Sequence, residues 1–173
     1  MKRIVLTFGL IAGAILAVMM VIQMSFMDEI GFDKGLIVGY TTMVLAFLMT
    51  FFGVKSYRDN VGGGAISFVR GLAIGLMIMV VATLCYVATW QVISSRMVPD
   101  FAEKYAAYSM DKTRKSGATQ AEIDAKAKEM ADFQESYKNP WMMAALTFLE
   151  PLPVGLLAAL ISAGVLRRKT RPA

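Results

Sequence analysis

Four long apolar runs constrain the fold of this chain more than any other feature. They cover residues 4–27, 35–54, 71–94 and 141–166. Each run reaches the length of about 20 residues that a helix needs to cross the roughly 30 Å hydrocarbon core of a bilayer. Within the runs the apolar residues are nearly continuous and do not follow the period of an amphipathic strand or helix. We therefore predict an all-α protein, a four-helix transmembrane bundle that forms a single integral membrane domain over residues 1–173.

A polar insert, residues 96–139, separates the third run from the fourth. Its first half carries aromatic residues at helical spacing, from Phe101 to Tyr108. Its second half begins with Thr119 and Glu122, the spacing of a helix capping box, and continues with an apolar stripe. We predict an extracytoplasmic hairpin of two amphipathic helices. Its stripes either pack on each other and on the mouth of the bundle, or bind a partner protein.

The distribution of basic residues predicts the orientation of the bundle. Nine Lys and Arg lie beside the run ends on one side: Lys2, Arg3, Lys55, Arg58, Arg70, Arg167, Arg168, Lys169 and Arg171. The other side also carries nine, but eleven acids dilute them over the insert and the first turn. Clustered Lys and Arg beside short loops favour retention in the cytoplasm. We expect both chain termini to be cytoplasmic.

Glu150 is the only charged residue inside an apolar run. A carboxylate near the centre of a bilayer costs about 2.5 to 3.5 kcal/mol, so such acids usually face a bundle interior or a water-filled cavity. Pro151 and Pro153 follow it and cannot donate hydrogen bonds to the carbonyls of Thr147 and Leu149. We predict an intramembrane acid and proton site at Glu150, Pro151 and Pro153. Alternatively, the prolines only kink the helix and a protonated Glu150 bonds a neighbour.

Polar residues in the second and third runs are candidate partners for this acid. The outer half of the third run is rich in them: Thr83, Cys85, Tyr86, Thr89, Trp90 and Gln91. The second run offers Tyr40, Thr41, Thr42 and Thr50. Those on an inward face at the depth of Glu150 can contact its carboxyl group.

A glycine loop between the second and third runs is the other candidate site. Three successive glycines, Gly62 to Gly64, permit positive φ and expose backbone N–H groups that can hold an anion. The predicted anionic-lipid site consists of these glycines with Ser67, which can cap the next helix, and three basic residues: Lys55, Arg58, Gly62, Gly63, Gly64, Ser67 and Arg70. The alternative is a tight cytoplasmic turn that only follows the positive-inside bias.

Two segments resemble a known family. They are Val54 to Asn60 followed by Gly-Gly-Gly-Ala-Ile-Ser-Phe, and Thr-Phe-Leu-Glu-Pro-Leu-Pro-Val-Gly from Thr147. The likeness extends to Asn139-Pro140, Leu160-Ile-Ser-Ala and Arg167-Arg168-Lys169. Together they resemble the domain of unknown function 4199, a family of small bacterial inner-membrane proteins. The resemblance implies four spans with an extracytoplasmic insert, and it implies no activity, cofactor or catalytic residue.

Composition restricts the chemistry that is available. The chain has no histidine and one cysteine, Cys85, so it lacks Ser–His and Cys–His pairs and the commonest zinc ligand. We expect no enzyme, no metal, no cofactor and no nucleic-acid partner. One hypothesis is a structural or accessory protein that contacts anionic lipid headgroups, a membrane-protein partner or a second copy of itself. The alternative is a small proton-coupled transporter or channel that uses Glu150.

Overall fold

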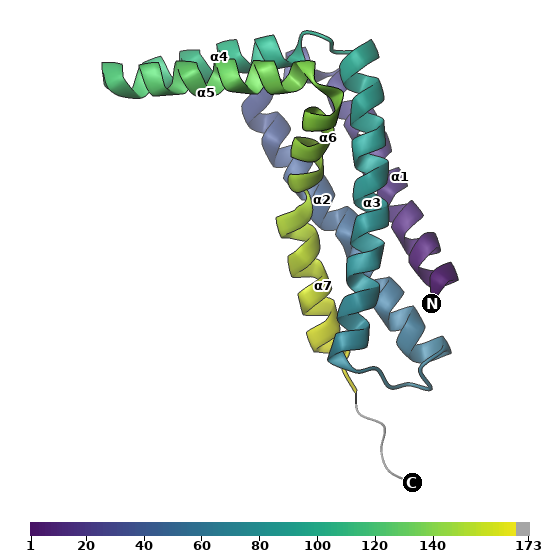
Figure 1. The fold of residues 1–173 in the computed structure, drawn as a ribbon. Coiled ribbons are helices and arrows are strands. Elements are labelled where there is room, and N and C mark those ends of the chain that lie inside the picture. The colour runs from purple at the N-terminus through teal and green to yellow at the C-terminus, as the bar shows by residue number, and fades with distance from the viewer. Residues whose placement is uncertain (169–173) are drawn as a thin grey trace.

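The computed structural model describes residues 1–168, and all but short connections among them are α-helical (Figure 1). Two of the basic residues counted for orientation, Lys169 and Arg171, lie outside this range. The helices are α1 (Lys2–Ser25), α2 (Met27–Asn60), α3 (Phe68–Arg96), α4 (Phe101–Lys115), α5 (Gln120–Lys138), α6 (Pro140–Leu149) and α7 (Leu152–Leu166). The predicted all-α fold is confirmed over this part of the chain.

Four helical stretches are long and apolar enough to cross a membrane. They are α1, α2, α3 and the combined stretch Pro140–Leu166, which joins α6 to α7. The last three contain the predicted runs 35–54, 71–94 and 141–166, and α1 covers the first run up to Ser25. Two boundaries lie earlier than predicted, because Met27 already begins α2 and Ser67 caps α3 by accepting a hydrogen bond from the Arg70 N–H at 3.3 Å. Gly31 interrupts α2 with a φ of 73°, a conformation that glycine adopts without steric penalty.

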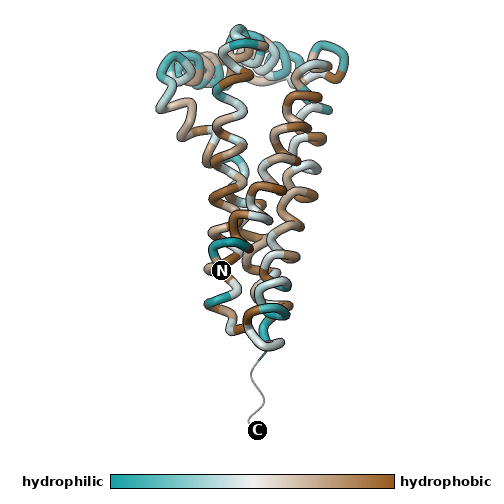
Figure 2. The backbone as a smooth tube through the Cα atoms, turned by 90° about the vertical axis from the view of Figure 1, so that its right-hand side faces the viewer, coloured by the Kyte–Doolittle hydropathy of each residue, from teal (hydrophilic) through white to brown (hydrophobic). Residues whose placement is uncertain are grey.

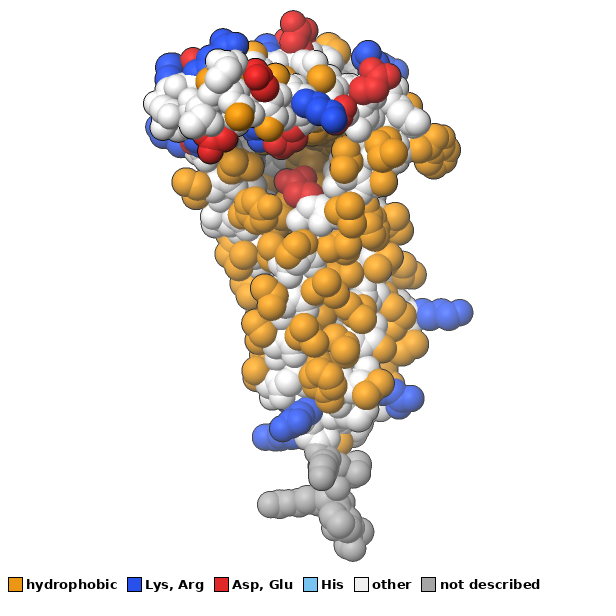
Figure 3. Space-filling view, turned by 60° about the vertical axis from the view of Figure 1, so that its left-hand side comes forward, with side chains coloured by type: hydrophobic (Ala, Val, Ile, Leu, Met, Phe, Trp, Pro, Cys, Tyr) orange, Lys and Arg blue, Asp and Glu red, His pale blue; other side chains and the backbone are white. Residues whose placement is uncertain are grey.

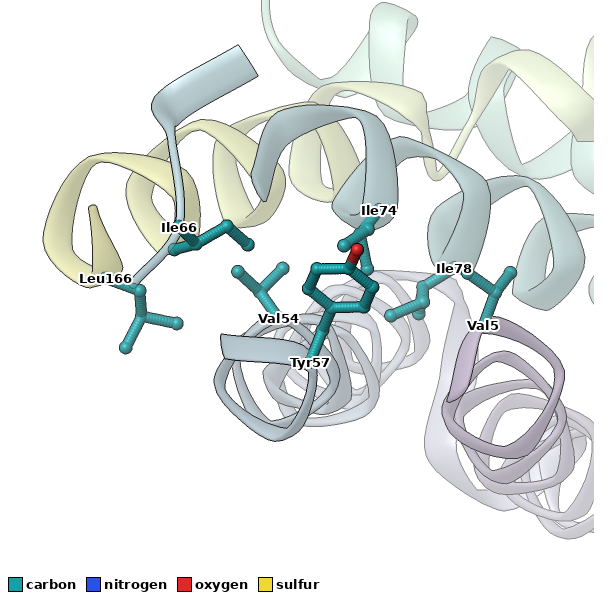
Figure 4. Packing of buried hydrophobic residues seen from close by; sticks show 7 residues of the cluster. All are labelled: Val5, Val54, Tyr57, Ile66, Ile74, Ile78 and Leu166. Atoms are coloured by element: carbon teal, nitrogen blue, oxygen red, sulfur yellow. The ribbon is translucent and has the colours of Figure 1, made fainter. Parts of the chain in front are cut away.

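The spans pack as a bundle with α3 at its centre. α3 packs against α1, α2 and α7, and α7 also packs against α2. Gly75 allows the close approach of α3 and α7, because a Cβ atom there would lie 3.0 Å from the Ala159 Cβ. Gly71, one helical turn earlier, also lies against α7, because a Cβ atom there would lie 3.3 Å from the Ala163 Cα. Buried apolar side chains fill the end of the bundle where the chain begins, and Figure 4 shows this cluster: Val5, Val54, Tyr57, Ile66, Ile74, Ile78 and Leu166.

The outside of the bundle is apolar along its length. Figure 2 shows hydrophobic residues along the spans and hydrophilic ones in the hairpin, and Figure 3 shows hydrophobic side chains over the sides of the bundle. Ile37 and Val165, for example, are 69% and 68% exposed. Exposed apolar area of this extent fits contact with lipid tails. The structure thus agrees with a membrane protein.

The insert forms a helical hairpin that lies across one end of the bundle (Figure 1). α4 packs against α5, and Gly117 makes the turn between them with a φ of 77°. The predicted capping box is present, because Thr119 and Glu122 bond each other's backbone at the start of α5. The side chain of Phe32 in α2 packs under α4, with its ring 4.9 Å from that of Tyr108. α1 begins and α7 ends toward the opposite end of the bundle (Figure 1).

Candidate functional site

Glu150 lies at the junction of α6 and α7, beside Tyr86 of α3. The Tyr86 hydroxyl donates a hydrogen bond to the Glu150 Oε2 at 2.8 Å. Glu150 follows Pro140 by ten residues and Tyr86 precedes Arg96 by ten, so both lie roughly 15 Å inside the end of the bundle that carries the hairpin. The expectation that a polar residue of the third run meets Glu150 at its own depth is confirmed for Tyr86.

The carboxyl group of Glu150 faces a cavity of about 320 Å³ beneath the hairpin. Helices α1, α2, α3 and α6 form its walls, and aromatic residues of α4 and α5 form its roof. Lining residues at the depth of Glu150 include Tyr40, Gly39, Tyr86 and Thr147. Glu150 is exposed to this space and is not enclosed by the bundle. Figure 3 shows the hollow under the hairpin, with an acidic side chain inside it.

The cavity is open at the side of the bundle. α6 packs against α3 and α5, whereas α2 packs against α1, α3 and α7. The gap therefore lies between α2 and α6, where the exposed side chains of Leu36, Tyr40 and Leu146 line the cavity. If the bundle spans a bilayer, this opening would face lipid, because both helices belong to stretches that are long and apolar enough to cross a membrane. A ligand could enter from the membrane without passing the hairpin.

The prolines shape this opening and are not part of the cavity wall. Pro151 is buried and Pro153 is exposed, and neither lines the cavity. Glu150 keeps helical dihedral angles, with φ −60° and ψ −51°, although a residue before proline usually avoids them. The α-helix is interrupted at residues 150–151, where α6 ends and α7 begins, and the span kinks there, as the alternative interpretation of the two prolines states. The bend is visible between α6 and α7 in Figure 1, and α7 packs on α2.

The aromatic roof of the cavity continues into the core of the hairpin. The Phe101 ring lies 4.8 Å from that of Trp90 and 6.1 Å from that of Tyr137. Burial raises the pKa of Tyr137 to about 12, since a phenolate is poorly solvated there. The apolar stripes of the hairpin thus pack on each other and on the mouth of the bundle. This agrees with the first of the two sequence interpretations.

The glycine loop does not have the predicted row of free N–H groups. The N–H groups of Gly62 and Gly64 donate to the carbonyls of Tyr57 and Arg58 at 2.9 Å, and that of Ile66 donates to Arg168. These bonds satisfy the last carbonyls of α2, which a helix end otherwise leaves unpaired. Gly63 and Gly64 do have positive φ, as predicted. Two of the three glycine N–H groups therefore cap α2, and the anionic-lipid site at this loop stays a prediction.

The basic residues around this loop are also engaged. Lys55 and Arg58 both pair with Asp59, at 2.8 and 2.7 Å. Arg70 is exposed at the start of α3, next to the capping Ser67. The structure therefore brings the predicted basic residues near the loop but neutralises two of them in part. What remains is the alternative interpretation, a tight turn on the basic side of the bundle.

One comparison with known proteins found a match. A family model described as "Protein of unknown function (DUF4199)" matches residues 7–168. The chain belongs to this family. The DUF4199 match covers the glycine loop, the Glu150 segment and the hairpin, so the resemblance found in two motifs extends over nearly the whole chain. No match was found among curated proteins or among solved structures.

Sequence reasoning missed several cavity residues of this DUF4199 chain. Gln23 of α1 lines the cavity, and its side-chain amide donates to the Gly35 carbonyl at 2.9 Å. The hairpin residues Phe101 and Tyr137 close the roof. Their aromatic spacing was visible in the sequence and predicted an amphipathic stripe. Only the placement of the hairpin over the bundle shows that part of this stripe faces the space above Glu150.

Proposed function

We propose that this chain is a multi-pass protein of the bacterial inner membrane that binds a largely apolar small molecule in the cavity beneath the hairpin. The observation that carries the proposal is the position of Glu150. The one acid within the four apolar runs lines a cavity of about 320 Å³, and the opening of this cavity between α2 and α6 would face lipid. Small-molecule sites typically have volumes of about 300 to 1,000 Å³, apolar walls and a few polar groups that orient the ligand. This cavity has all three properties.

The energetic position of Glu150 supports the proposal. A carboxyl group at this depth destabilises an isolated helix, so intramembrane acids usually have a functional partner. Tyr86 bonds one of its oxygens, and the described residues provide no further hydrogen bond to the carboxyl group. The remaining oxygen is free to bind a ligand. Glu150 would then orient the polar end of a molecule whose apolar part contacts the surrounding aromatic residues.

The orientation follows from the basic residues at the end of the bundle opposite the hairpin. Lys2, Arg58, Arg70 and Arg168 all belong to segments at that end. Such clusters favour the cytoplasmic side of a bacterial membrane. We place both termini in the cytoplasm and the hairpin outside, so the lateral opening lies in the outer half of the bilayer.

An accessory role through anionic lipid has less support. The loop amides that would hold a headgroup bond backbone carbonyls instead, and Asp59 pairs with Lys55 and Arg58. Non-specific attraction between the remaining basic residues and an anionic leaflet is compatible with either function. Docking of a protein partner on the hairpin stripes also has less support, because these stripes pack on each other and on Phe32 and Trp90.

Proton-coupled transport is the second candidate function. It is favoured by a carboxyl group that faces a cavity at the bend of a span, where a proton and a ligand could compete for the same oxygen. Transport requires the same ligand-binding cavity and, in addition, a path for the ligand and the proton to the opposite side of the membrane. A test of ligand binding therefore comes before a test of transport.

A small, neutral aryl diazirine tests whether an apolar molecule enters the cavity. The full-length protein is irradiated with this photolabel in lipid vesicles, and labelled residues are mapped by mass spectrometry. We expect label on Tyr86, which lines the cavity, as well as on the 85% exposed Trp141. Label on Trp141 without label on Tyr86 would contradict the proposal.

A matched pair of glycine substitutions controls the experiment. Gly39 lines the cavity, so Gly39→Leu should fill it and reduce labelling of Tyr86 severalfold. Gly164 faces open space, with nothing within 4 Å of a Cβ atom there, so Gly164→Leu should leave the labelling unchanged. Equal loss of label in both variants would indicate a general folding defect and would remove support from the proposed entry route.

A further inference from the structure

We infer that the ligand of this cavity is an organic ammonium ion attached to an apolar skeleton. This inference rests on the proposed binding function and names the chemical class that Glu150 selects. Three properties of the cavity carry it: its charge, its hydrogen-bonding capacity and its aromatic walls. Each is independent of the others.

The cavity has one ionisable acid and no basic residue to pair with it. Among the described residues that line it, none is Lys or Arg, and Glu150 takes part in no ion pair. An anionic ligand would be repelled by the carboxylate and would find no positive group. A cationic ligand would supply the missing counter-charge in surroundings where ion pairing is strong because water is scarce. The charge of the cavity therefore selects for a cation.

Three polar groups near Glu150 already donate hydrogen bonds within the protein. The Tyr86 hydroxyl donates to Glu150, the Thr147 hydroxyl donates to the Met143 carbonyl at 2.8 Å, and one N–H of the Gln23 amide donates to the Gly35 carbonyl. The Tyr40 hydroxyl, which also lines the cavity, can still donate to an oxygen atom of a ligand. The second oxygen of Glu150 is an acceptor, so the group that binds it must be a donor, and an ammonium group is a charged donor.

Aromatic rings surround the same space. The lining includes eight of them: Phe32, Tyr40, Tyr86, Trp90, Phe101, Tyr105, Phe133 and Tyr137. The face of an aromatic ring carries negative potential and attracts ammonium groups, with Trp and Tyr the strongest of these residues. The same rings offer apolar area to a hydrocarbon group. The walls thus suit both halves of an amphiphilic amine.

Trp90 marks a further contact nearer the hairpin. Its side chain is 7% exposed and lines the cavity, and its indole N–H lies near the Tyr137 hydroxyl without forming a hydrogen bond of good geometry. Buried donors of this kind are normally paired. An oxygen atom of the ligand or a water molecule held with it would satisfy this N–H group. Glu150 and Trp90 would then bind opposite ends of the ligand.

The ammonium group can come from two sources. A cavity of about 320 Å³ accommodates a small lipophilic amine, but only a part of a two-chain phospholipid. Because the opening between α2 and α6 faces lipid, the ethanolamine headgroup of a phospholipid could enter while its chains remain outside. A free amine and a phosphatidylethanolamine headgroup would both bind Glu150 through an ammonium group. The experiment below distinguishes these two sources.

Protection from the aryl diazirine provides the test. The full-length protein in phosphatidylglycerol vesicles is labelled in the presence of octylammonium chloride or of octanol, which is its neutral counterpart. We expect octylammonium to reduce labelling of Tyr86 at a concentration about tenfold lower than octanol does, as a charge-assisted hydrogen bond implies. Glu150→Gln keeps an acceptor for Tyr86 but removes the charge, so this preference should disappear. Gly164→Leu should retain it.

Octylammonium accumulates at an anionic membrane, whereas octanol does not. Comparing Glu150→Gln with the unmodified chain removes this effect, because both proteins are in vesicles of the same composition.

A second arm of the experiment replaces half of the phosphatidylglycerol with phosphatidylethanolamine and adds no amine. Protection of Tyr86 in this arm, lost in Glu150→Gln, identifies the lipid headgroup as the source. Protection by octylammonium alone identifies a free amine.

The inference is overturned if octylammonium and octanol protect equally and phosphatidylethanolamine does not protect, or if Glu150→Gln retains the preference for the amine. In either case, label on Tyr86 that Gly39→Leu reduces would still support the proposed binding function. Absence of that label would instead contradict the proposed function itself. The two failures are therefore distinguishable.

Discussion

Tyr86 and Glu150 join the central helix of the bundle to the bend of the last span, through a hydrogen bond of 2.8 Å between residues 64 positions apart. Both side chains face the space under the hairpin. The bond orients the only carboxyl group within the four apolar runs. The stability of the half of the bundle beneath the hairpin and the ligand binding that we propose therefore depend on the same contact.

Removing the Tyr86 hydroxyl tests this contact. Tyr86→Phe leaves Glu150 without its donor, and an unsatisfied polar group in apolar surroundings destabilises a protein by about 1 to 3 kcal/mol. We expect a lower thermal unfolding midpoint in lipid nanodiscs. Tyr40→Phe is the matched control, because Tyr40 lines the same cavity, is 47% exposed and makes no such bond to Glu150. Equal midpoints for the two variants would contradict the role of the bond.

The prolines after Glu150 should hold the cavity open. Replacing Pro151 and Pro153 together with alanine restores two N–H donors and allows a straighter helix. We expect α6 to move toward α2, so the distance between spin labels at positions 36 and 146, measured by electron paramagnetic resonance in a Cys85→Ser background, should shorten. Pro99→Ala, in the connection before the hairpin, is the control. An unchanged distance would show that packing alone sets the bend.

The contact of α3 with α7 has no room for an additional carbon atom. Gly75→Ala would place a Cβ 3.0 Å from the Ala159 Cβ and 3.1 Å from the Thr50 Cγ2. Overpacking of this kind usually destabilises by about 1 to 3 kcal/mol. Gly164→Ala meets no atom within 4 Å and should be neutral or slightly stabilising, since alanine favours helix over glycine. Thermal unfolding of both variants checks the difference, and a neutral Gly75→Ala would contradict this description of the interface.

Burial of the Tyr137 phenol leads us to predict that the protein loses stability at high pH. Burial raises the pKa of Tyr137 in the folded protein from 10.0, the ordinary value of a tyrosine, to about 12. The unfolded chain releases the Tyr137 proton near pH 10, whereas the folded protein keeps it up to about pH 12. The contribution to stability is therefore fully present below pH 10 and is lost as the pH rises from about 10 to about 12. The loss is at most about 3 kcal/mol. Unfolding measured across this range should be less pH-dependent in Tyr137→Phe, and an identical profile would refute the assignment.

The sequence predicted those parts of the fold that depend on local pattern. The apolar runs, the Ser67 cap and the capping box at Thr119 are properties of neighbouring residues, and the structure contains all of them. The pairing of Glu150 with a polar residue of the third run followed from depth alone, since the bilayer fixes where each residue of a span lies. Tyr86 is the residue that also faces the cavity.

The remaining features depend on contacts between distant segments. The cavity exists because the bend between α6 and α7 directs α6 away from α2. The sequence of neither segment indicates this arrangement by itself. In the glycine loop, Ile66 pairs with Arg168, over one hundred residues later, and the N–H groups of Gly62 and Gly64 cap α2. A glycine triplet permits either use of its N–H groups, and only the tertiary structure decides between them.

The central claim is that Glu150 binds the ammonium group of an apolar ligand, and solid-state nuclear magnetic resonance tests it most directly. The protein, labelled with ¹³C in its glutamate carboxyl groups, is reconstituted in bilayers with ¹⁵N-octylammonium, and dipolar coupling between the two nuclei is measured. The account predicts a carboxyl carbon within about 4 Å of the ammonium nitrogen, as in an ion pair, and loss of this coupling in Glu150→Gln. No coupling in the unmodified protein, or coupling that persists in Glu150→Gln, would contradict it.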